Sequence, residues 1–386
     1  MPERSQETTV RVGLAGLLAL AATYGLGRQA YGLFVPSFQA EFALGLDGIG
    51  YVAGAAQLGY LAATVATGAV EARYGPRLPV VVGCILLALG AGMIATAQST
   101  VPFVVGVILA GTSAGGAWAP FSDVVAERVP PGRRRRALAL VNAGSPAGLL
   151  IASLLVAVTG SAWRVAWLAF AAVGVLGAIV NLVVLPSAAP ARASRTRHGL
   201  WPPAARRLFA VAALASMTSG AYFAYAPEAA QTAGLPVWIG AAMWGALGLS
   251  GAVVGGFGGE IANRFALGPA LAVTWLGMAL ALASLLAIAG TPVGALASAA
   301  LFGAAFTAGY AFVAMWSQEV FPDRPTTGFT ATIVCIAAGF SLGPVLYGVV
   351  ATFVGRPAAP IAASVPAILA AVLSIVPPRS STRRST

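Results

Sequence analysis

Twelve separate runs of mostly apolar residues divide the chain, and this feature limits the possible folds more than any other. The hydrocarbon core of a bilayer is roughly 30 Å thick, so an α-helix of about 20 apolar residues crosses it. The predicted spans are residues 12–36, 48–70, 78–97, 101–123, 137–159, 163–185, 208–227, 237–259, 268–289, 292–316, 327–354 and 357–376. The sequence therefore predicts an all-α membrane protein with twelve transmembrane helices.

The composition supports this interpretation. Of the 386 residues, 59% are hydrophobic and only 9% are charged, whereas a soluble domain has about 25% charged residues. Disordered chains are polar, so disorder is excluded as well. The first apolar run begins late and has no clear cleavage site, so we expect a permanent span rather than a signal peptide.

The basic residues are distributed unevenly between the two sides of the predicted membrane. All 22 are arginine, and they outnumber the 11 acidic residues. When the loops are assigned alternately to the two sides, 19 of the 22 fall on the side of both termini, Arg164 and Arg356 fall on the other, and Arg28 lies within a span. The positive-inside rule places the arginine-rich side in the cytoplasm. We therefore expect a plasma (inner) membrane protein with cytoplasmic termini and no nucleic-acid partner.

A polar segment divides the spans into two equal groups. Residues 186–207 are rich in Pro, Ala, Ser and Arg and predict a cytoplasmic linker between two six-helix bundles, residues 1–185 and 208–386. The bundles share an internal repeat at an offset of 191, in which Ala30, Tyr31, Pro36 and Arg73 align with Ala221, Tyr222, Pro227 and Arg264. Repeats of this kind place a substrate site near the midplane between the halves.

The segment between the second and third spans carries the most specific motif. Gly68, Arg73, Gly75 and Arg77 match the pattern G-x-x-x-D-R-x-G-R-R, with Ala72 at the acidic position. In this motif the chain resembles transporters of the major facilitator superfamily. Gly144 to Gly148, which includes Pro146, is a partial match to the G-P-x-x-G pattern of antiporters in that superfamily. Residues 25–36 also look like the first span of a poorly characterised bacterial branch.

This resemblance implies two pseudo-symmetric six-helix halves and secondary transport by alternating access. It also implies that the first and fourth helices of each three-helix unit line the cavity. Glycine permits tight turns and close helix contacts, and arginine can bind helix C-terminal carbonyls or carboxylates. We therefore expect a conformational role for one set of residues: Gly68, Arg73, Gly75, Arg77, Arg264 and Pro146. The alternative is that the arginines only set topology.

Arg28 is the one arginine expected deep inside a span. It lies about 24 Å along a helix that starts near residue 12, and burying it there costs at least roughly 2.5–3.5 kcal/mol. Tyr24 and Tyr31 are four residues before it and three after it, on the same face of an α-helix. We expect the charge to bind an anionic substrate between two tyrosine hydroxyls. Otherwise Arg28 reaches the outer headgroups or pairs with helix carbonyls.

Other polar and aromatic residues inside spans complete the predicted binding site. They are Gln57, Trp118, Tyr222, Tyr225 and Tyr310, and each is alternatively a packing residue or an interfacial anchor. Tyr222 carries more weight because it is the repeat partner of Tyr31. No carboxylate is predicted clearly at mid-membrane, and Asp123 and Glu228 are the nearest candidates to carry protons.

The sequence offers no catalytic or metal-binding cluster. Its single histidine, His198, lies in the predicted linker, and Cys84 and Cys335 lie far apart in apolar runs. We therefore expect a protein that is not an enzyme and needs no cofactor or metal.

The leading functional hypothesis is a secondary transporter that moves a small organic anion held by Arg28. The alternative is efflux of an amphipathic drug or metabolite by proton antiport, and a third hypothesis is a receptor-like protein that no longer transports. The expected partners are a small-molecule substrate, membrane lipid and, under antiport, protons. The chain is expected to work as a monomer.

Overall fold

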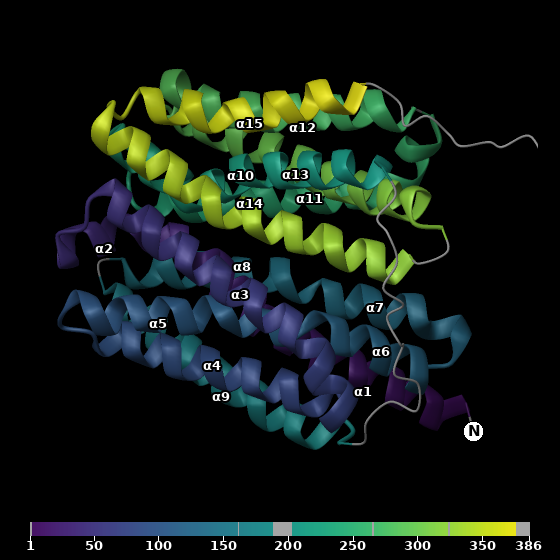
Figure 1. Ribbon diagram of the computed structural model, residues 1–386. Coiled ribbons are helices and arrows are strands. Elements are labelled where there is room, and N and C mark those ends of the chain that lie inside the picture. Colours follow the sequence, from purple (N-terminus) through teal and green to yellow (C-terminus); the bar gives the residue numbers. More distant parts are fainter. Residues whose placement is uncertain (1, 161, 188–202, 265, 323–324, 376–386) are drawn as a thin grey trace, which may run out of the picture.

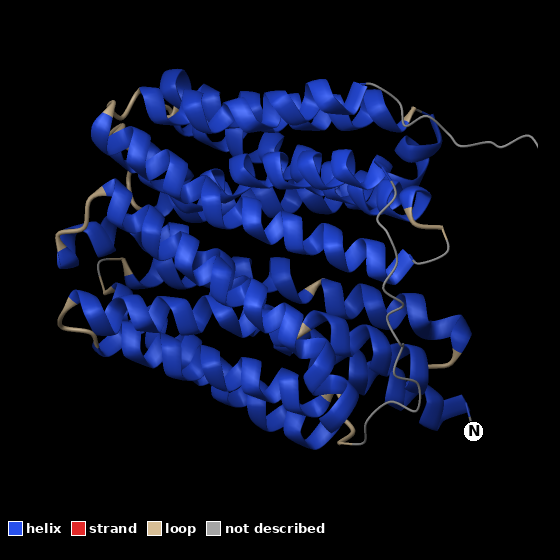
Figure 2. Ribbon diagram, viewed as in Figure 1, coloured by secondary structure: helices blue, strands red, loops and turns tan. Residues whose placement is uncertain are grey.

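A computed structural model describes residues 2–160, 162–187, 203–264, 266–322 and 325–375 of the chain. These residues form helices and connecting loops without a strand (Figure 2). The first half contains α1 (Pro2–Leu20), η1 (Ala21–Gln29), η2 (Ala30–Phe34), α2 (Val35–Phe42), α3 (Leu46–Tyr74), α4 (Arg77–Thr96), α5 (Thr100–Thr112), η3 (Ser113–Gly116), α6 (Trp118–Arg128), η4 (Pro131–Arg133), α7 (Arg134–Asn142), α8 (Gly144–Thr159) and α9 (Trp163–Val184).

The second half has one helix for each span. Its elements are α10 (Pro203–Thr232), α11 (Trp238–Arg264), α12 (Leu267–Ile288), α13 (Pro292–Val320), α14 (Pro325–Phe353) and α15 (Ala358–Ile375). Within the described residues, 11 helical stretches are long and apolar enough to cross a membrane. The remaining long helix, α11, contains a shorter apolar stretch, Trp238–Val254, so the count is near the twelve predicted spans. The predicted all-α fold is therefore confirmed.

Several helices extend past the predicted spans because their polar ends continue beyond the apolar stretch. α10 already begins at Pro203, and the first span continues through Pro36 to Phe42. Pro36 is tolerated because it lies in the first turn of α2, where its missing N–H has no helical partner to lose. Residues 188–202 of the predicted linker, with His198, lie outside the described residues.

The helices run side by side, with the first half in the lower part of Figure 1 and the second half in the upper part. The main contacts between the halves are α3 with α14, α8 with α11, and η2 with α10. We call the end with the loops at residues 43–45, 233–237 and 354–357 the Asp47 end. The opposite end, with the loops at residues 75–76 and 129–133, is the Arg73 end. These two names make no assumption about sidedness.

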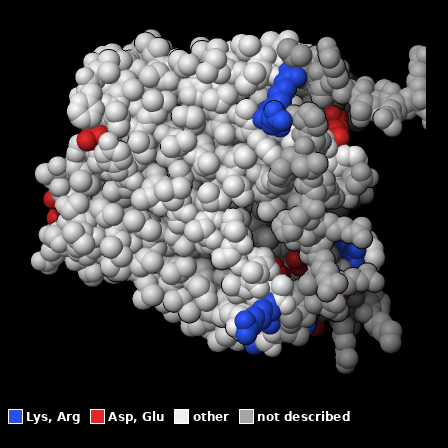
Figure 3. Space-filling view, in the orientation of Figure 1, with Lys and Arg blue, Asp and Glu red and all other residues white. Residues whose placement is uncertain are grey.

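The halves are held together at the Asp47 end. Tyr225 donates a hydrogen bond to the Leu46 carbonyl (2.7 Å), and the Asp47 N–H donates to Thr352 Oγ1 (3.3 Å). Tyr225 is fully buried there. At the Arg73 end, by contrast, Trp118 of the first half is 37% exposed, with its ring centroid 6.5 Å from that of Phe329. Figure 3 shows the surface hollowed towards this end. The structure is therefore closed at the Asp47 end.

The first span is an irregular helix in its middle. The α-helical pattern stops at Leu20, a π-helical stretch occupies η1, and a 3₁₀ stretch follows in η2. A Cβ at Gly25 would lie 2.5 Å from the Gly148 Cα, and one at Gly27 would lie 2.7 Å from Ser113 Oγ. Only glycine therefore allows this stretch to pack directly on α8 and η3. π-Helical segments in α-helices are frequent at functional sites, and Arg28 lies in this one.

Candidate functional site

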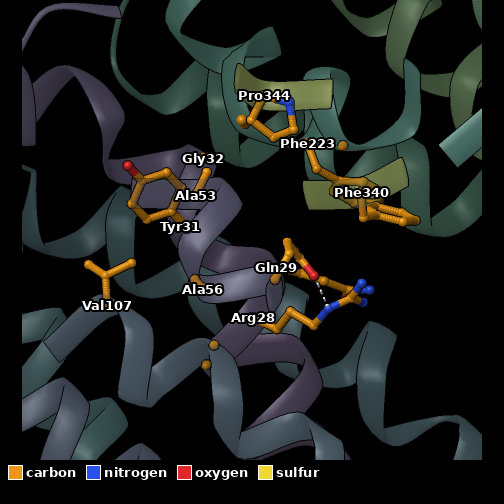
Figure 4. A pocket seen from close by; sticks show the side chains of 15 residues that line it. Arg28, Gln29, Tyr31, Gly32, Ala53, Ala56, Val107, Phe223, Phe340 and Pro344 are labelled. Carbon is orange, nitrogen blue, oxygen red and sulfur yellow. Dashed lines mark hydrogen bonds between the residues drawn. The ribbon is translucent and has the colours of Figure 1, made fainter. Parts of the chain in front are cut away.

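Arg28 is partly buried near the end of η1, where both halves of the protein contact its side chain. Its Nε donates a hydrogen bond to Gln57 Oε1 of α3 (2.9 Å; dashed line in Figure 4). The guanidinium carbon lies 4.3 Å from the ring centroid of Tyr60, in the first half, and 4.9 Å from that of Phe340, in the second half. Cation–π contacts of this kind stabilise a charge away from bulk water.

The two terminal nitrogens of Arg28 have no hydrogen-bond partner among the described residues. The contacts that orient the guanidinium therefore leave the side formed by its two terminal nitrogens, here called the Nη edge, available for a ligand. An arginine edge of this kind can pair with the two oxygens of a carboxylate.

A small cavity lies beside Arg28 at the interface of the halves. Its volume is about 30 Å³, room for about two water molecules. The first half contributes Ala53 and Gln57 to its wall, and the second half contributes Phe223, Phe340 and Pro344 (Figure 4). Because the walls belong to different halves, a relative movement of the halves changes the size of this cavity.

Tyr24 and Tyr31 flank Arg28 in the sequence but behave differently in the structure. The Tyr24 ring centroid lies 5.9 Å from the guanidinium carbon, and its hydroxyl hydrogen-bonds to Tyr60 (3.3 Å). Tyr31 lines the cavity, but its hydroxyl donates to the Ile49 carbonyl (3.1 Å). The prediction of a charge between two tyrosine hydroxyls is therefore wrong for Tyr31. The chain changes from a π-helical to a 3₁₀ stretch between Arg28 and Tyr31, so the α-helical spacing assumed for this pair does not apply.

The other predicted binding residues are spread over four environments. Tyr222 is fully buried within the second half and hydrogen-bonds to Ser298 (2.9 Å), and Tyr225 seals the Asp47 end. Trp118 is exposed at the Arg73 end.

Tyr310 is only partly buried, and its ring centroid lies 6.4 Å from that of Phe340. The structure thus brings Gln57, Tyr24 and Tyr310 close to the Arg28 site and leaves Tyr222 and Trp118 away from it.

Tyr60 and Phe340 contact Arg28 but were not among the predicted site residues. Tyr60 follows Gln57 by three residues on α3, and this helical spacing could have indicated it. Phe340 gave no comparable signal, because its position depends on how α14 packs against the first half.

The Gly68–Arg77 segment lies at the Arg73 end. Gly75 ends α3 with a φ of 80°, a backbone conformation that favours glycine. Arg77 Nε donates to the carbonyl of Leu185 (2.6 Å), just after the end of α9. Arg73 is exposed, and its guanidinium carbon lies 5.3 Å from the ring centroid of Tyr74. Arg77 thus supports a helix end in this state, whereas Arg73 makes no hydrogen bond or ion pair with the other half within the described residues.

The remaining candidates for a conformational role are Gly68, Pro146 and Arg264. A Cβ at Gly68 would have no atom within 4 Å. Pro146 is exposed in the first turn of α8. The side chain of Arg264 lies outside the described residues. Among the described residues, no group of three or more His, Cys, Asp or Glu side chains could hold a metal ion.

Comparison with known families identifies the fold. The family model described as "Major Facilitator Superfamily" matches residues 17–344. The chain belongs to the major facilitator superfamily. The resemblance inferred from the Gly68–Arg77 motif is thereby confirmed. No curated protein sequence matches the chain.

Solved structures of superfamily transporters share this fold across nearly the whole chain. The nucleoside transporter NupG has 11% sequence identity and a TM-score of 0.78, and the match covers 95% of this chain and 99% of NupG. A bacterial homologue of the human lysosomal transporter Spinster, in an inward-facing and occupied conformation, has 15% identity and a TM-score of 0.75, covering 97% and 96%. A D-xylose–proton symporter has 17% identity and a TM-score of 0.71, covering 96% and 97%.

At identities this low, the structural similarity establishes the common fold and does not identify the substrate of this chain. Membership of the superfamily indicates that this multi-pass membrane protein is a secondary transporter rather than an enzyme. Transporters of this superfamily bind small-molecule substrates, and some of them couple transport to protons.

Proposed function

We propose that this transporter carries a small organic anion by alternating access and that Arg28 binds the anion. One observation carries the proposal: the guanidinium lies between the two halves with its Nη edge unpaired. A partly buried charge without a counter-ion is costly, so an anionic ligand that completes the ion pair gains affinity. Because both halves contact Arg28, a ligand bound there can favour one arrangement of the halves over another.

A binding and transport assay tests this function. Purified protein is screened by thermal unfolding against panels of organic anions, cations and neutral solutes, and ligands that bind are then tested for counterflow in proteoliposomes. A ligand that binds the folded state raises the unfolding temperature by mass action. We expect stabilisation by organic anions and exchange of the same anions across the membrane. Stabilisation by cations alone would contradict the proposal and favour efflux of an amphipathic compound by proton antiport.

The domain organisation and sidedness belong to the same proposal. Two six-helix halves, residues 1–185 and 208–386, move against each other around a linker at residues 186–207. The basic side chains visible in Figure 3 lie mainly towards the Arg73 end, which supports placing that end in the cytoplasm. The described structure then corresponds to an inward-facing state in the plasma membrane, in which the extracellular Asp47 end is closed.

Cysteine labelling measures this topology directly. In a background lacking Cys84 and Cys335, Gly45→Cys should react with a membrane-impermeant reagent added outside intact cells. Arg195→Cys should react only after the membrane is opened. External labelling of residue 195 in intact cells would contradict the proposed orientation.

The Gly68–Arg77 segment is proposed to stabilise the opposite, outward-facing state. Arg73 is exposed in the present arrangement, so its loss removes no hydrogen bond or ion pair with the other half among the described residues. We predict that Arg73→Ala shifts the equilibrium towards the state closed at the Asp47 end, with substrate selectivity unchanged. Labelling of cysteines on the two cavity faces measures the shift, and Arg128→Ala, at a nearby helix end, is the matched control. Equal labelling in Arg73→Ala and the parent protein would contradict the proposal that Arg73 stabilises the outward-facing state.

A further inference from the structure

The second half presents a patch of aromatic rings to Arg28, and this patch narrows the chemistry of the ligand. Phe340 contacts the guanidinium directly. The ring centroids of Phe223, Phe306 and Tyr310 lie 6.1, 6.4 and 6.4 Å from that of Phe340. Phe306 and Tyr310 are only partly buried. Phe340 and Phe223 are buried, 5% and 9% exposed, so the accessible ring surface near the charged group belongs to Phe306 and Tyr310.

The patch offers rings rather than hydrogen-bonding groups. The Tyr310 hydroxyl already bonds to Ser216 (2.7 Å) and Ser219 (3.0 Å) within its own half. The other three members are phenylalanines. A ligand that extends from Arg28 towards the second half therefore meets an aromatic surface, and aromatic rings pair favourably in offset-stacked or edge-to-face geometry.

The charge at the site matches a monoanion. Arg28 is the one cationic side chain among the described residues that line the cavity. Its Nε is engaged by Gln57, so a single Nη edge remains for an acceptor with two oxygens. A carboxylate fits this edge as a bidentate partner. A second negative charge on the ligand would have no cation to meet it and would remain costly to desolvate.

We propose that the substrate class of the Arg28 site is the aromatic monocarboxylates. The carboxylate pairs with the Nη edge of Arg28, and the aromatic ring packs against Phe340 and its neighbours in the second half. The cavity of about 30 Å³ beside Arg28 must widen to admit the ring, which a relative movement of the halves allows. Such a ligand contacts both halves at once. This inference rests on the proposed anion site and adds a requirement for an aromatic ring.

Benzoate and cyclohexanecarboxylate separate this inference from the anion site itself, because they share size and charge and differ in aromaticity. Dissociation constants are measured from thermal unfolding of the full-length purified protein, with phthalate as the dianion and benzylamine as the cation. We expect benzoate to bind about 2- to 12-fold more tightly than cyclohexanecarboxylate. Phthalate should bind more weakly than benzoate, and benzylamine should give no shift.

Two variants locate the preference. Arg28→Ala should no longer bind benzoate or cyclohexanecarboxylate. Phe340→Leu should bring the ratio of the two dissociation constants towards one. Phe42→Leu removes a ring that stacks on Phe103 at a centroid distance of 4.4 Å, away from the site, and should leave the ratio unchanged. If Phe340→Leu does not fold, Phe340→Tyr replaces it and should retain the wild-type ratio of the two dissociation constants. The ratio measured for the wild-type protein tests the aromatic requirement independently of either variant.

The possible failures are distinguishable. Equal affinities for benzoate and cyclohexanecarboxylate in the wild-type protein would overturn the aromatic requirement while leaving the anion site in place. A preference that persists in Phe340→Leu would likewise overturn the assignment to this patch. If neither monocarboxylate binds, or if both still bind to Arg28→Ala, the anion site at Arg28 fails as well.

Discussion

Arg28→Ala should abolish transport while leaving the protein folded in the membrane. Truncating one partner of a buried, hydrogen-bonded charge pair costs about 2–5 kcal/mol, which corresponds to a loss of roughly 30- to 4,000-fold in affinity. The fold should tolerate the change because the guanidinium makes one side-chain hydrogen bond, to Gln57. Counterflow of a bound organic anion in proteoliposomes measures transport, and thermal unfolding without ligand measures folding.

Arg28→Lys provides the matched variant. It restores the positive charge but cannot present a planar pair of donors, so transport should remain severely impaired. Gln57→Glu gives a further comparison, because a carboxylate at this position would compete with the substrate for Arg28. Near-normal flux in Arg28→Ala would contradict the anion proposal. Faster flux of a cationic compound in the same variant would favour the efflux alternative.

Gly32→Val should drive the transporter out of the arrangement described here. A Cβ at this position would overlap the carbonyl oxygen of Phe223 in the opposite half, so the added side chain opposes closure at the Asp47 end. Overpacking of this kind costs about 1–3 kcal/mol, equivalent to a shift of roughly 5- to 150-fold in the equilibrium between the two states. Separation of the halves at the Asp47 end removes the clash, so the opposite state should be favoured.

Two glycine controls separate this effect from general destabilisation. A Cβ at Gly343 would overlap the Met217 carbonyl, but both residues belong to the second half. Gly343→Ala should therefore lower the unfolding temperature without exposing the Asp47 end. A Cβ at Gly92 would have no atom within 4 Å. Gly92→Ala should therefore change neither the unfolding temperature nor the exposure of the Asp47 end. Distances between spin labels at the Asp47 ends of α3 and α14 report the opening. An unchanged distance distribution in Gly32→Val would contradict the assignment of this contact to a gate.

The fold was predictable because the thickness of the bilayer sets the minimum length of each apolar helix independently of the others. Each apolar run of sufficient length had to form a helix, and the Gly68–Arg77 motif indicated the superfamily. Helix ends were less predictable: α10 begins at Pro203 rather than at residue 208. The hydropathy of a run fixes its apolar part and says little about how far polar residues continue the helix.

The candidate site was predictable only in part. Arg28 was indicated by the cost of a charge inside a span, and Gln57 was indicated as a polar residue in a neighbouring span. The orientation of Tyr31 could not be foreseen, because the π-helical stretch arises from close packing of Gly25 and Gly27 against α8 and η3. The contact with Phe340 depends on the packing of two helices that are more than 250 residues apart in the sequence. Neither feature has a local sequence signal.

Alternating exposure of the cavity beside Arg28 is the central claim, and a single cysteine can measure it. Ala53 lines this cavity and is 8% exposed, so Ala53→Cys in a background lacking Cys84 and Cys335 adds a small reporter. The account predicts that a membrane-impermeant thiol reagent reaches this cysteine mainly from the cytoplasmic side. When Gly32→Val is added, the reagent should reach it from the extracellular side. Labelling from one and the same side in both proteins would contradict alternating access around Arg28.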